Sequence, residues 1–450
     1  MDHPVTPPRE RLRAAYLRDE SEALDALIGE ARLPAESARR VQDRARALVE
    51  EVRTRQKAVA GMQSFLREYD LSSQEGVLLM CVAEALLRIP DAATADKLIR
   101  DKLSQGDWER HVGRNNSLLV NAGTWGMMLT GKLVSLDAAS AGNAGAWLAR
   151  LAARAGEPVV RVALRQGMKL MAEQFVMGRT IGDALERSRS AEHAAYRHSY
   201  DMLGEAAFTA ADAERYFAAY EHAIDAIAAH RIEGASSVFQ RPGISIKLSA
   251  LHPRYEYAQR GRVMDELVPR VQSLAERARR GDVGVTLDAE EADRLELSLD
   301  IFERVFASSA LQGWEGFGLA VQAYQKRSPF AIEWLAEIAR RERRRIMVRL
   351  VKGAYWDSEV KRAQMQGLSG YPVYTRKANT DVSYLACARR IIEAPDAFYG
   401  QFATHNAHTV ATVIERMPAG QPFEFQRLHG MGDDLYDEVT RMGHACRVYA

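Results

Sequence analysis

The sequence predicts an α/β fold in which a (β/α)8 barrel of the TIM type follows a helical N-terminal arm and a small α-helical domain. Eight short apolar runs occur after about residue 190, and most of the gaps between them hold a strongly helical segment. The length of 450 residues exceeds the roughly 250 residues of one barrel and leaves about 200 for other units.

The parts of the chain differ in composition. From Pro8 to about Arg110 apolar residues recur at helical spacing, with few β-branched runs. Residues 131–160 mix Gly, Ala and Ser, which is typical of a connector. We therefore expect a helical arm and α domain over residues 1–130, a connector and a helix over 131–189, and the barrel over 190–450 without its eighth helix.

The expected strands are the apolar runs themselves. They are SYDMLGEAA (199–207), GISIKLSALH (243–252), VGVTLDAEE (283–291), GFGLAVQAY (316–324), RIMVRLVKGAYW (345–356), YGQFATHN (399–406), FEFQRLHGM (423–431) and CRVYA (446–450). Because side chains alternate faces along a strand, Ile244 and Ile246 should face the helices while Ser245, Lys247 and Ser249 face the barrel interior.

Polar side chains that face inward fall late in several of these runs. They are Lys247, Asp288, Gln322, Arg349, Lys352, His405 and Asn406. Barrel enzymes keep their active sites at the C-terminal mouth, so the pattern predicts a catalytic site there. Singly, Lys247 and Asp288 could form a structural salt bridge, and His405 could be a core histidine.

A metal site is the rival interpretation of the same mouth. His405 and His408 could join Asp288 and Glu290 as ligands in a metal-dependent barrel lyase or aldolase.

Charge, cysteine content and the length of apolar runs indicate which partners and which location to expect. Lys plus Arg number 61 and Asp plus Glu 60, which indicates no nucleic-acid partner. The basic run at 340–345 is interpreted as a solvated helix end. Three distant cysteines and no apolar run of membrane-spanning length predict a cytoplasmic protein, with peripheral membrane contact left open.

Several long motifs resemble one family. YDMLGEAA, SIKLSALHPRY, TLDAEE, VQAYQKR, MVRLVKGAYWD, YPVYTRKANTDVSYLAC, FATHNAHT and FEFQRLHGMG are similar to the proline dehydrogenase module of the bifunctional proline utilisation A proteins. The resemblance implies a flavin-dependent oxidoreductase acting on a CH–NH bond. It would pass a hydride from L-proline to N5 of FAD, yielding Δ1-pyrroline-5-carboxylate, and electrons to a quinone, in the first step of proline catabolism to glutamate.

The same resemblance assigns residues to the cofactor. The implied FAD-binding residues are Gln322, Arg349, Val351, Lys352, Gly353, Trp356, Thr375, Lys377, His405 and Asn406. Among them Arg349 would lie near flavin N5, Trp356 would pack by the adenine, and Gly353 would let the backbone approach the cofactor. No metal is implied.

Substrate residues follow in the same way. The resemblance places Lys247, Asp288, Ala354, Leu428, Tyr449 and Glu205 around proline, and gives catalytic roles to Lys247, Asp288, Arg349 and Tyr449. Lys247 would help hold the proline carboxylate, and Leu428 and Tyr449 would form apolar walls over the ring.

The family pattern extends beyond the printed sequence. It continues into an eighth helix with two carboxylate-binding arginines and into an aldehyde dehydrogenase module, whereas this sequence ends at Ala450. We therefore expect a fragment of a bifunctional protein that binds proline weakly by itself and lacks the second activity. Some members of the family add an N-terminal ribbon-helix-helix DNA-binding domain, and we expect none here because this sequence begins with the helical arm. We also expect a homo-oligomer.

Overall fold

The structure, a computed structural model, describes residues 7–58, 176–204, 206–230 and 234–450. The chain divides into two units, one of Met1–Val52 with Gly178–Ala450 and one of Arg53–Met177. Almost all of the second unit lies outside the described residues, so the boundaries expected at residues 130 and 189 stay predictions.

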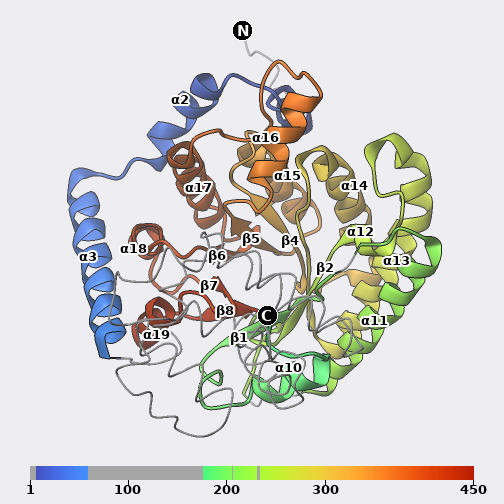
Figure 1. Cartoon of the computed structure of the whole chain (residues 1–450), viewed down its shortest axis with the longest axis horizontal. Helices are drawn as coiled ribbons and strands as arrows, with labels where there is room; N and C mark the ends of the chain where they lie inside the picture. The colour runs from blue at the N-terminus through green and yellow to red at the C-terminus, as the bar shows by residue number, and fades with distance from the viewer. Residues whose placement is uncertain (1–6, 59–175, 205, 231–233) are drawn as a thin grey trace, which may run out of the picture. The chain divides into compact units, whose positions relative to one another are not determined.

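The first unit is built around a closed barrel of eight parallel strands in the order β1 to β8 (Figure 1). The strands are β1 (Arg197–Tyr200), β2 (Gly243–Ile246), β3 (Gly284–Leu287), β4 (Phe317–Gln322), β5 (Ile346–Val351), β6 (Phe398–Ala403), β7 (Phe423–Leu428) and β8 (Cys446–Tyr449). Pairing of β1 with β8 through Ser199 and Tyr449 closes the barrel. The predicted (β/α)8 barrel is confirmed.

Helices surround the strands on their outer side (Figure 1). They are α10 (Ile181–Arg187), α11 (Ala210–Ala229), α12 (Leu248–Leu251), α13 (Arg260–Gly281), α14 (Leu295–Phe306), α15 (Ser328–Arg341), α16 (Trp356–Met365), α17 (Lys377–Ile392), α18 (Ala407–Arg416) and α19 (Asp433–Arg441). Phe302 of α14 stacks on Phe317 of β4 at 5.2 Å. This contact shows why alternate strand residues are large and apolar, since they fill the layer between strands and helices.

The N-terminal arm consists of α1 (Pro8–Ala14), α2 (Glu20–Ala31) and α3 (Ala35–Ala58). Arg13 of α1 pairs with Glu296 of α14 at 2.6 Å. Arg40 of α3 pairs with Glu415 of α18 at 2.6 Å. The arm residues that precede Arg53 thus contact barrel helices from α14 round to α18, and the expected helical region before the barrel is present.

Two details of the sequence prediction were wrong. The first strand ends at Tyr200 and the second at Ile246, so Ser249 lies on α12 and not on a strand face. The basic run is not a solvated helix end throughout: Arg344 is 6% exposed, and its guanidinium lies 3.8 Å from the centre of the Phe306 ring. The difference concerns Arg344, since Arg340 and Arg341 end α15 with side chains that are more than half exposed, as predicted.

Within the described ranges, every helix is too short or too polar to traverse a lipid bilayer.

Candidate active site

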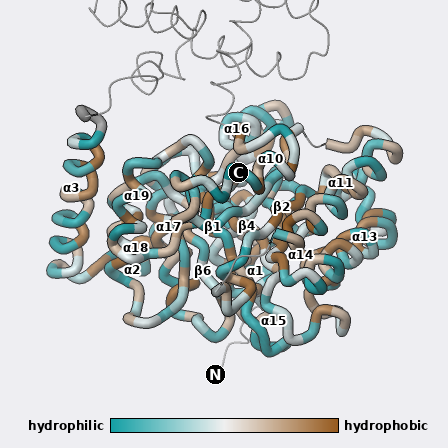
Figure 2. Tube along the Cα trace, turned by 90° about the horizontal axis from the view of Figure 1, so that it is seen from below, coloured by the Kyte–Doolittle hydropathy of each residue, from teal (hydrophilic) through white to brown (hydrophobic). Residues whose placement is uncertain are grey.

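The strand ends of the barrel carry the predicted polar residues. Lys247 and Asp288 follow β2 and β3 directly, Gln322 and Tyr449 are the last residues of β4 and β8, and Arg349 lies inside β5. Figure 2 shows α16 and the end of the chain after β8 at the same end of the barrel. That end is therefore the C-terminal mouth.

Asp288 is the centre of a charged cluster at this mouth. Its Oδ1 accepts a hydrogen bond from Arg349 at 2.6 Å, and its Oδ2 accepts one from the Tyr449 hydroxyl at 2.6 Å. Lys247 Nζ lies 3.3 Å from Asp288 Oδ2 and 2.7 Å from Asp201 Oδ1. The structure thus brings together four residues that the sequence predicted, and adds Asp201.

Burial shifts the pKa values of two groups in this cluster. Burial and repulsion from Asp288 raise the pKa of Asp201, although Lys247 acts in the opposite direction. Burial and the nearby carboxylates of Asp288 and Asp201 raise the pKa of Tyr449 well above its usual value. Tyr449 therefore stays a neutral hydrogen-bond donor to Asp288.

Arg349 is held by four different side chains. Besides Asp288, its guanidinium donates to Gln426 Oε1 at 2.7 Å, to Ser199 Oγ at 3.1 Å and to Ser245 Oγ at 3.0 Å. The Tyr449 ring lies 4.8 Å from the guanidinium carbon. Arg349 is only 3% exposed. Its positive charge is thus fixed in place by the barrel interior.

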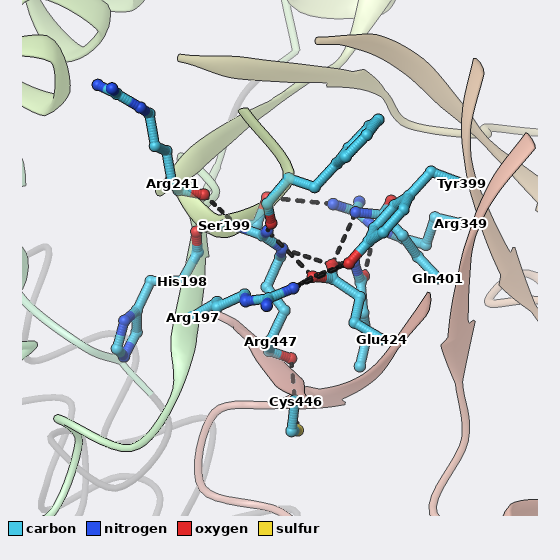
Figure 3. Close-up of polar contacts among 12 residues, drawn as sticks. Arg197, His198, Ser199, Arg241, Arg349, Tyr399, Gln401, Glu424, Cys446 and Arg447 are labelled. Carbon is cyan, nitrogen blue, oxygen red and sulfur yellow. Dashed lines mark hydrogen bonds and ion pairs between the residues drawn. The ribbon is translucent and has the colours of Figure 1, made fainter. Parts of the chain in front are cut away.

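A second polar cluster lies at the opposite, N-terminal end of the barrel, and we call it the floor cluster (Figure 3). It consists of Arg197, Tyr399, Gln401, Glu424 and Arg447. Glu424 is fully buried and pairs with Arg447 at 2.6 Å and Arg197 at 3.0 Å. Burial alone would raise the pKa of Glu424, but the two arginines outweigh it and lower that pKa, so the carboxylate stays charged.

Gln426 connects the floor cluster to the mouth. Its side-chain amide donates to Glu424 Oε1 at 3.1 Å while its carbonyl oxygen accepts from Arg349. Since both partners are charged, they fix the orientation of the amide. Continuous hydrogen bonds therefore run from the floor of the barrel to Asp288.

Gln322 and Gly353 shape the loops of the mouth. The Gln322 amide donates to the Glu290 carbonyl at 2.8 Å and accepts from the Ala354 N–H at 3.3 Å. Gly353 has a φ of +138°, and a Cβ there would lie 2.5 Å from the ring of Tyr324. Only glycine fits this position, because any side chain would meet the Tyr324 ring and the backbone conformation is one that L residues rarely adopt.

The segment after β5 holds the next predicted residues. Lys352 forms an ion pair with Asp381. Trp356 is 42% exposed, and its indole N–H donates to the Tyr374 carbonyl at 2.9 Å. Thr375 follows directly, and Lys377 begins α17. Val351 ends β5, and its carbonyl accepts from the Ala323 N–H at 2.8 Å.

His405, Asn406 and Leu428 lie near the ends of β6 and β7. His405 Nε2 accepts from the Leu428 N–H at 3.2 Å, which places the ring proton on Nδ1. Burial, followed by the charge of Arg427, lowers the pKa of His405, so the ring is neutral and offers a hydrogen bond but no charge. Asn406 caps α18 through its bond from the Thr409 N–H at 2.9 Å. Leu428 is 45% exposed.

The rival metal site finds no support in this geometry. Among the described residues, no three His, Cys, Asp or Glu side chains are arranged to hold a metal ion. Glu290 instead accepts from the Ser249 N–H at 3.0 Å and pairs with Arg294 at 2.6 Å. Glu205, expected near the substrate, lies outside the described residues.

Sequence reasoning missed Asp201, Ser199 and Gln426 as neighbours of the predicted residues, and it placed Ser245 on the interior face without its contact to Arg349. Asp201 follows a strand directly, as Asp288 does, and an earlier end of the first strand would have indicated it. Gln426 lies two residues after Glu424 on β7, so alternation predicts a shared face.

The geometry defines the class of the protein first. A closed parallel barrel with buried charges gathered at its C-terminal mouth is the arrangement of TIM-barrel enzymes. A family profile described as "Proline dehydrogenase" matches residues 184–450, more than half of the chain. The chain belongs to the proline dehydrogenase family, as the sequence motifs predicted.

Two further profiles match the remainder. One, described as "Proline utilization A proline dehydrogenase N-terminal domain", covers residues 6–53. The other, described as "DNA-binding domain of Proline dehydrogenase", covers residues 61–175, which lie outside the described residues. The sequence had indicated a helical layer and a connector here and no DNA-binding domain, and the description of this profile disagrees with the last of these expectations.

Full-length relatives are much longer than this sequence. The chain is 52% identical to "Bifunctional protein PutA" of Escherichia coli (strain K12), over 99% of this chain and 34% of that protein. It is 50% identical to the protein of the same name from Rhizobium meliloti, over 98% of this chain and 36% of that protein. A crystal structure of a Bradyrhizobium japonicum proline utilization A (PutA) mutant, D779Y, has a TM-score of 0.73 and 46% identity, over 97% of this chain and 43% of that one. The chain thus spans about a third of the length of these curated relatives.

Proposed function

We propose that this chain oxidises L-proline to Δ1-pyrroline-5-carboxylate with FAD as its cofactor and a quinone as the final electron acceptor. The observation that carries the proposal is the cluster of Lys247, Asp288, Arg349 and Tyr449 at the mouth of a proline dehydrogenase family barrel. The reaction would be the first step of proline catabolism to glutamate.

The side chains of the mouth suit a flavin dinucleotide in their chemistry. Trp356 and Leu428 are large apolar side chains that stay 42% and 45% exposed there, which suits contact with flat rings. Gly353 has no room for a Cβ, and a residue without a side chain lets a ligand approach the backbone closely. Lys352, Lys377 and the neutral His405 supply donors for phosphate oxygens.

Proline presents a carboxylate and a small apolar ring. Lys247 supports the carboxylate as a cation held by Asp201 and Asp288. The ring of Tyr449 and the exposed side chain of Leu428 provide apolar surface for the pyrrolidine. The hydroxyl of Tyr449 donates a hydrogen bond to Asp288, and this bond fixes the orientation of the Tyr449 ring. Together these contacts would position proline C5 for transfer.

Bound FAD would supply the hydride acceptor, and the protein would supply position and charge. Arg349 acts as a fixed positive charge, since four of its donors are already engaged with protein side chains. Such a charge stabilises an anionic reduced ring system placed above it.

Proline-dependent reduction of a quinone analogue tests the proposal. The chain is loaded with FAD and assayed with proline, with Arg349→Met as the inactive variant and Arg362→Met, on the outer helix α16, as its control. We expect activity that Arg349→Met lowers at least roughly hundredfold. No proline-dependent reduction by the FAD-loaded chain would overturn the proposal.

A further inference from the structure

The segment that enters α17 is held by the N-terminal arm. Tyr374 is fully buried and packs against Ala23 and Leu27 of α2. Thr375 donates its backbone N–H to the Glu20 carboxylate at 3.0 Å, and its hydroxyl donates to the same carboxylate at 2.7 Å. The arm therefore determines how Thr375 is presented at the mouth.

Glu20 is a charged acceptor in this arrangement. It also accepts from Asn379 Nδ2 at 2.6 Å. Burial acts to raise the pKa of Glu20, but the hydrogen bonds from Asn379 and Thr375 outweigh it and lower that pKa. A carboxylate has no proton to give, so the hydroxyl hydrogen of Thr375 is committed to Glu20.

Thr375 can consequently contact a ligand only as a hydrogen-bond acceptor. Its hydroxyl oxygen still has lone pairs, so it can accept a hydrogen bond, but its N–H and O–H both donate to Glu20 and are not available to a phosphate oxygen. A ligand hydroxyl, such as that of a ribose, matches this requirement. Trp356, which the resemblance of the motifs places by the adenine, donates its indole N–H to the carbonyl of neighbouring Tyr374. Trp356 and Thr375 are therefore held close together by the segment around Tyr374, so both would contact the same end of the cofactor.

We propose that Glu20 of the arm is a positioning residue for the adenosine half of FAD. It holds Thr375 so that this threonine accepts a hydrogen bond from a sugar hydroxyl of the cofactor. The inference rests on the proposed function, because it takes FAD as the ligand of the mouth.

The arm has other anchors that do not involve Glu20. Arg416 donates to the carbonyls of Glu30 and Ala31 at the end of α2, and Arg390 pairs with Glu30 at 2.6 Å. Lys326 Nζ donates to the Arg18 carbonyl at 2.7 Å just before α2. A substitution of Glu20 should therefore leave α2 in place and change only the contact with Thr375 and Asn379.

Flavin binding to the FAD-free chain separates this role from simple packing. Dissociation constants for FAD and for FMN, which lacks the adenosine half, are measured by fluorescence titration for wild type, Glu20→Gln and Glu22→Gln. Glu22 is an exposed residue of the same helix, so its variant is a matched control. In Glu20→Gln an amide N–H faces the donors of Thr375 and Asn379. We expect FAD to bind roughly tenfold more weakly to this variant and FMN to bind as to wild type.

A second variant keeps the inference falsifiable. Thr375→Val removes the hydroxyl with little change in shape, so it should weaken FAD binding to a similar extent. The double variant Glu20→Gln/Thr375→Val should then bind FAD no more weakly than Thr375→Val alone, because the two substitutions remove the same contact with the cofactor. Unchanged FAD affinity in Glu20→Gln, or an equal loss of FAD and FMN, would overturn the inference. A wild-type chain that binds neither flavin would overturn the proposed function, and this inference with it.

Discussion

At the scale of single residues, Asp288 connects most of the mouth. It accepts from Arg349 and Tyr449 and lies 3.3 Å from Lys247 Nζ. Removal of any one of these three donors would leave the buried carboxylate with fewer hydrogen bonds and less compensating charge. The cations and carboxylates of the mouth therefore depend on one another, and removal of one member affects the others.

Lys247→Met tests this dependence, because methionine keeps much of the side-chain length and removes the charge. Asp201 and Asp288 would lose their shared cation, so we expect a loss of roughly 2 kcal/mol in unfolding free energy. We also expect the KM for proline to rise at least roughly tenfold. Thermal unfolding and steady-state kinetics measure the two effects. Lys361→Met, on the exposed side of α16, should change neither.

Gln426 is the residue through which the floor cluster reaches Arg349. Gln426→Leu removes the acceptor at Arg349 Nε while it preserves volume. The guanidinium would then be less firmly held, so the midpoint potential of bound flavin should fall and kcat should drop roughly tenfold. The potential is measured by spectroelectrochemical titration, with Gln421→Leu, before β7, as the control. A lower melting temperature with an unchanged potential would show a purely structural role.

Prediction from sequence succeeded for residues where strand alternation applied. Lys247, Asp288 and Arg349 were predicted at the mouth because each lies on or just after an apolar run. Asp201 was missed because the first run was taken to continue through it. The bond from Thr375 to Glu20 spans 355 positions, and no local pattern in the sequence encodes such a contact.

At the scale of elements, the arm helix α2 and the barrel helix α17 form one packed unit (Figure 1). The sequence predicted helices here but not which helices pack together, since an amphipathic pattern shows that one face is buried but does not identify the element that covers it. Strand ends were also predicted too late. The polar residues after β2 and β3 continue the alternation of the strands, although the backbone has already left the sheet.

Arg390→Met tests the attachment of the arm. Arg390 pairs with Glu30 of α2 and with Glu333 of α15, both at 2.6 Å. We expect the free energy of unfolding to fall by about 1–3 kcal/mol and amide hydrogen exchange in α2 to become faster. Arg389→Met is the control, since Arg389 pairs with Glu393, the residue directly after its own helix. Equal exchange in α2 for both variants would contradict the assignment.

At the scale of the whole unit, the barrel encloses charges of both signs along its axis. The pKa values of Glu424 and Glu20 are lowered in the folded state. The unfolded chain therefore binds more protons, and the stability these groups provide is present above about pH 4.3 and lost as pH falls below it. Asp201 acts in the opposite direction because its pKa is raised.

We therefore expect the melting temperature to fall as pH is lowered from about 5 to 3. Glu20→Gln should melt lower than wild type at pH 7 and lose less on acidification, since its contribution is already absent. Scanning calorimetry of both chains across this range measures the difference. Parallel curves for the two chains would contradict the stabilising role of the Glu20 carboxylate.

The central claim is that the mouth of this barrel binds a flavin and oxidises proline there. The most direct test is the visible absorbance of the FAD-loaded chain before and after proline is added without oxygen. The account predicts a flavin spectrum that proline bleaches, and bleaching at least roughly hundredfold slower in Arg349→Met. A chain that takes up no flavin, or a bound flavin that stays oxidised at saturating proline, would contradict it.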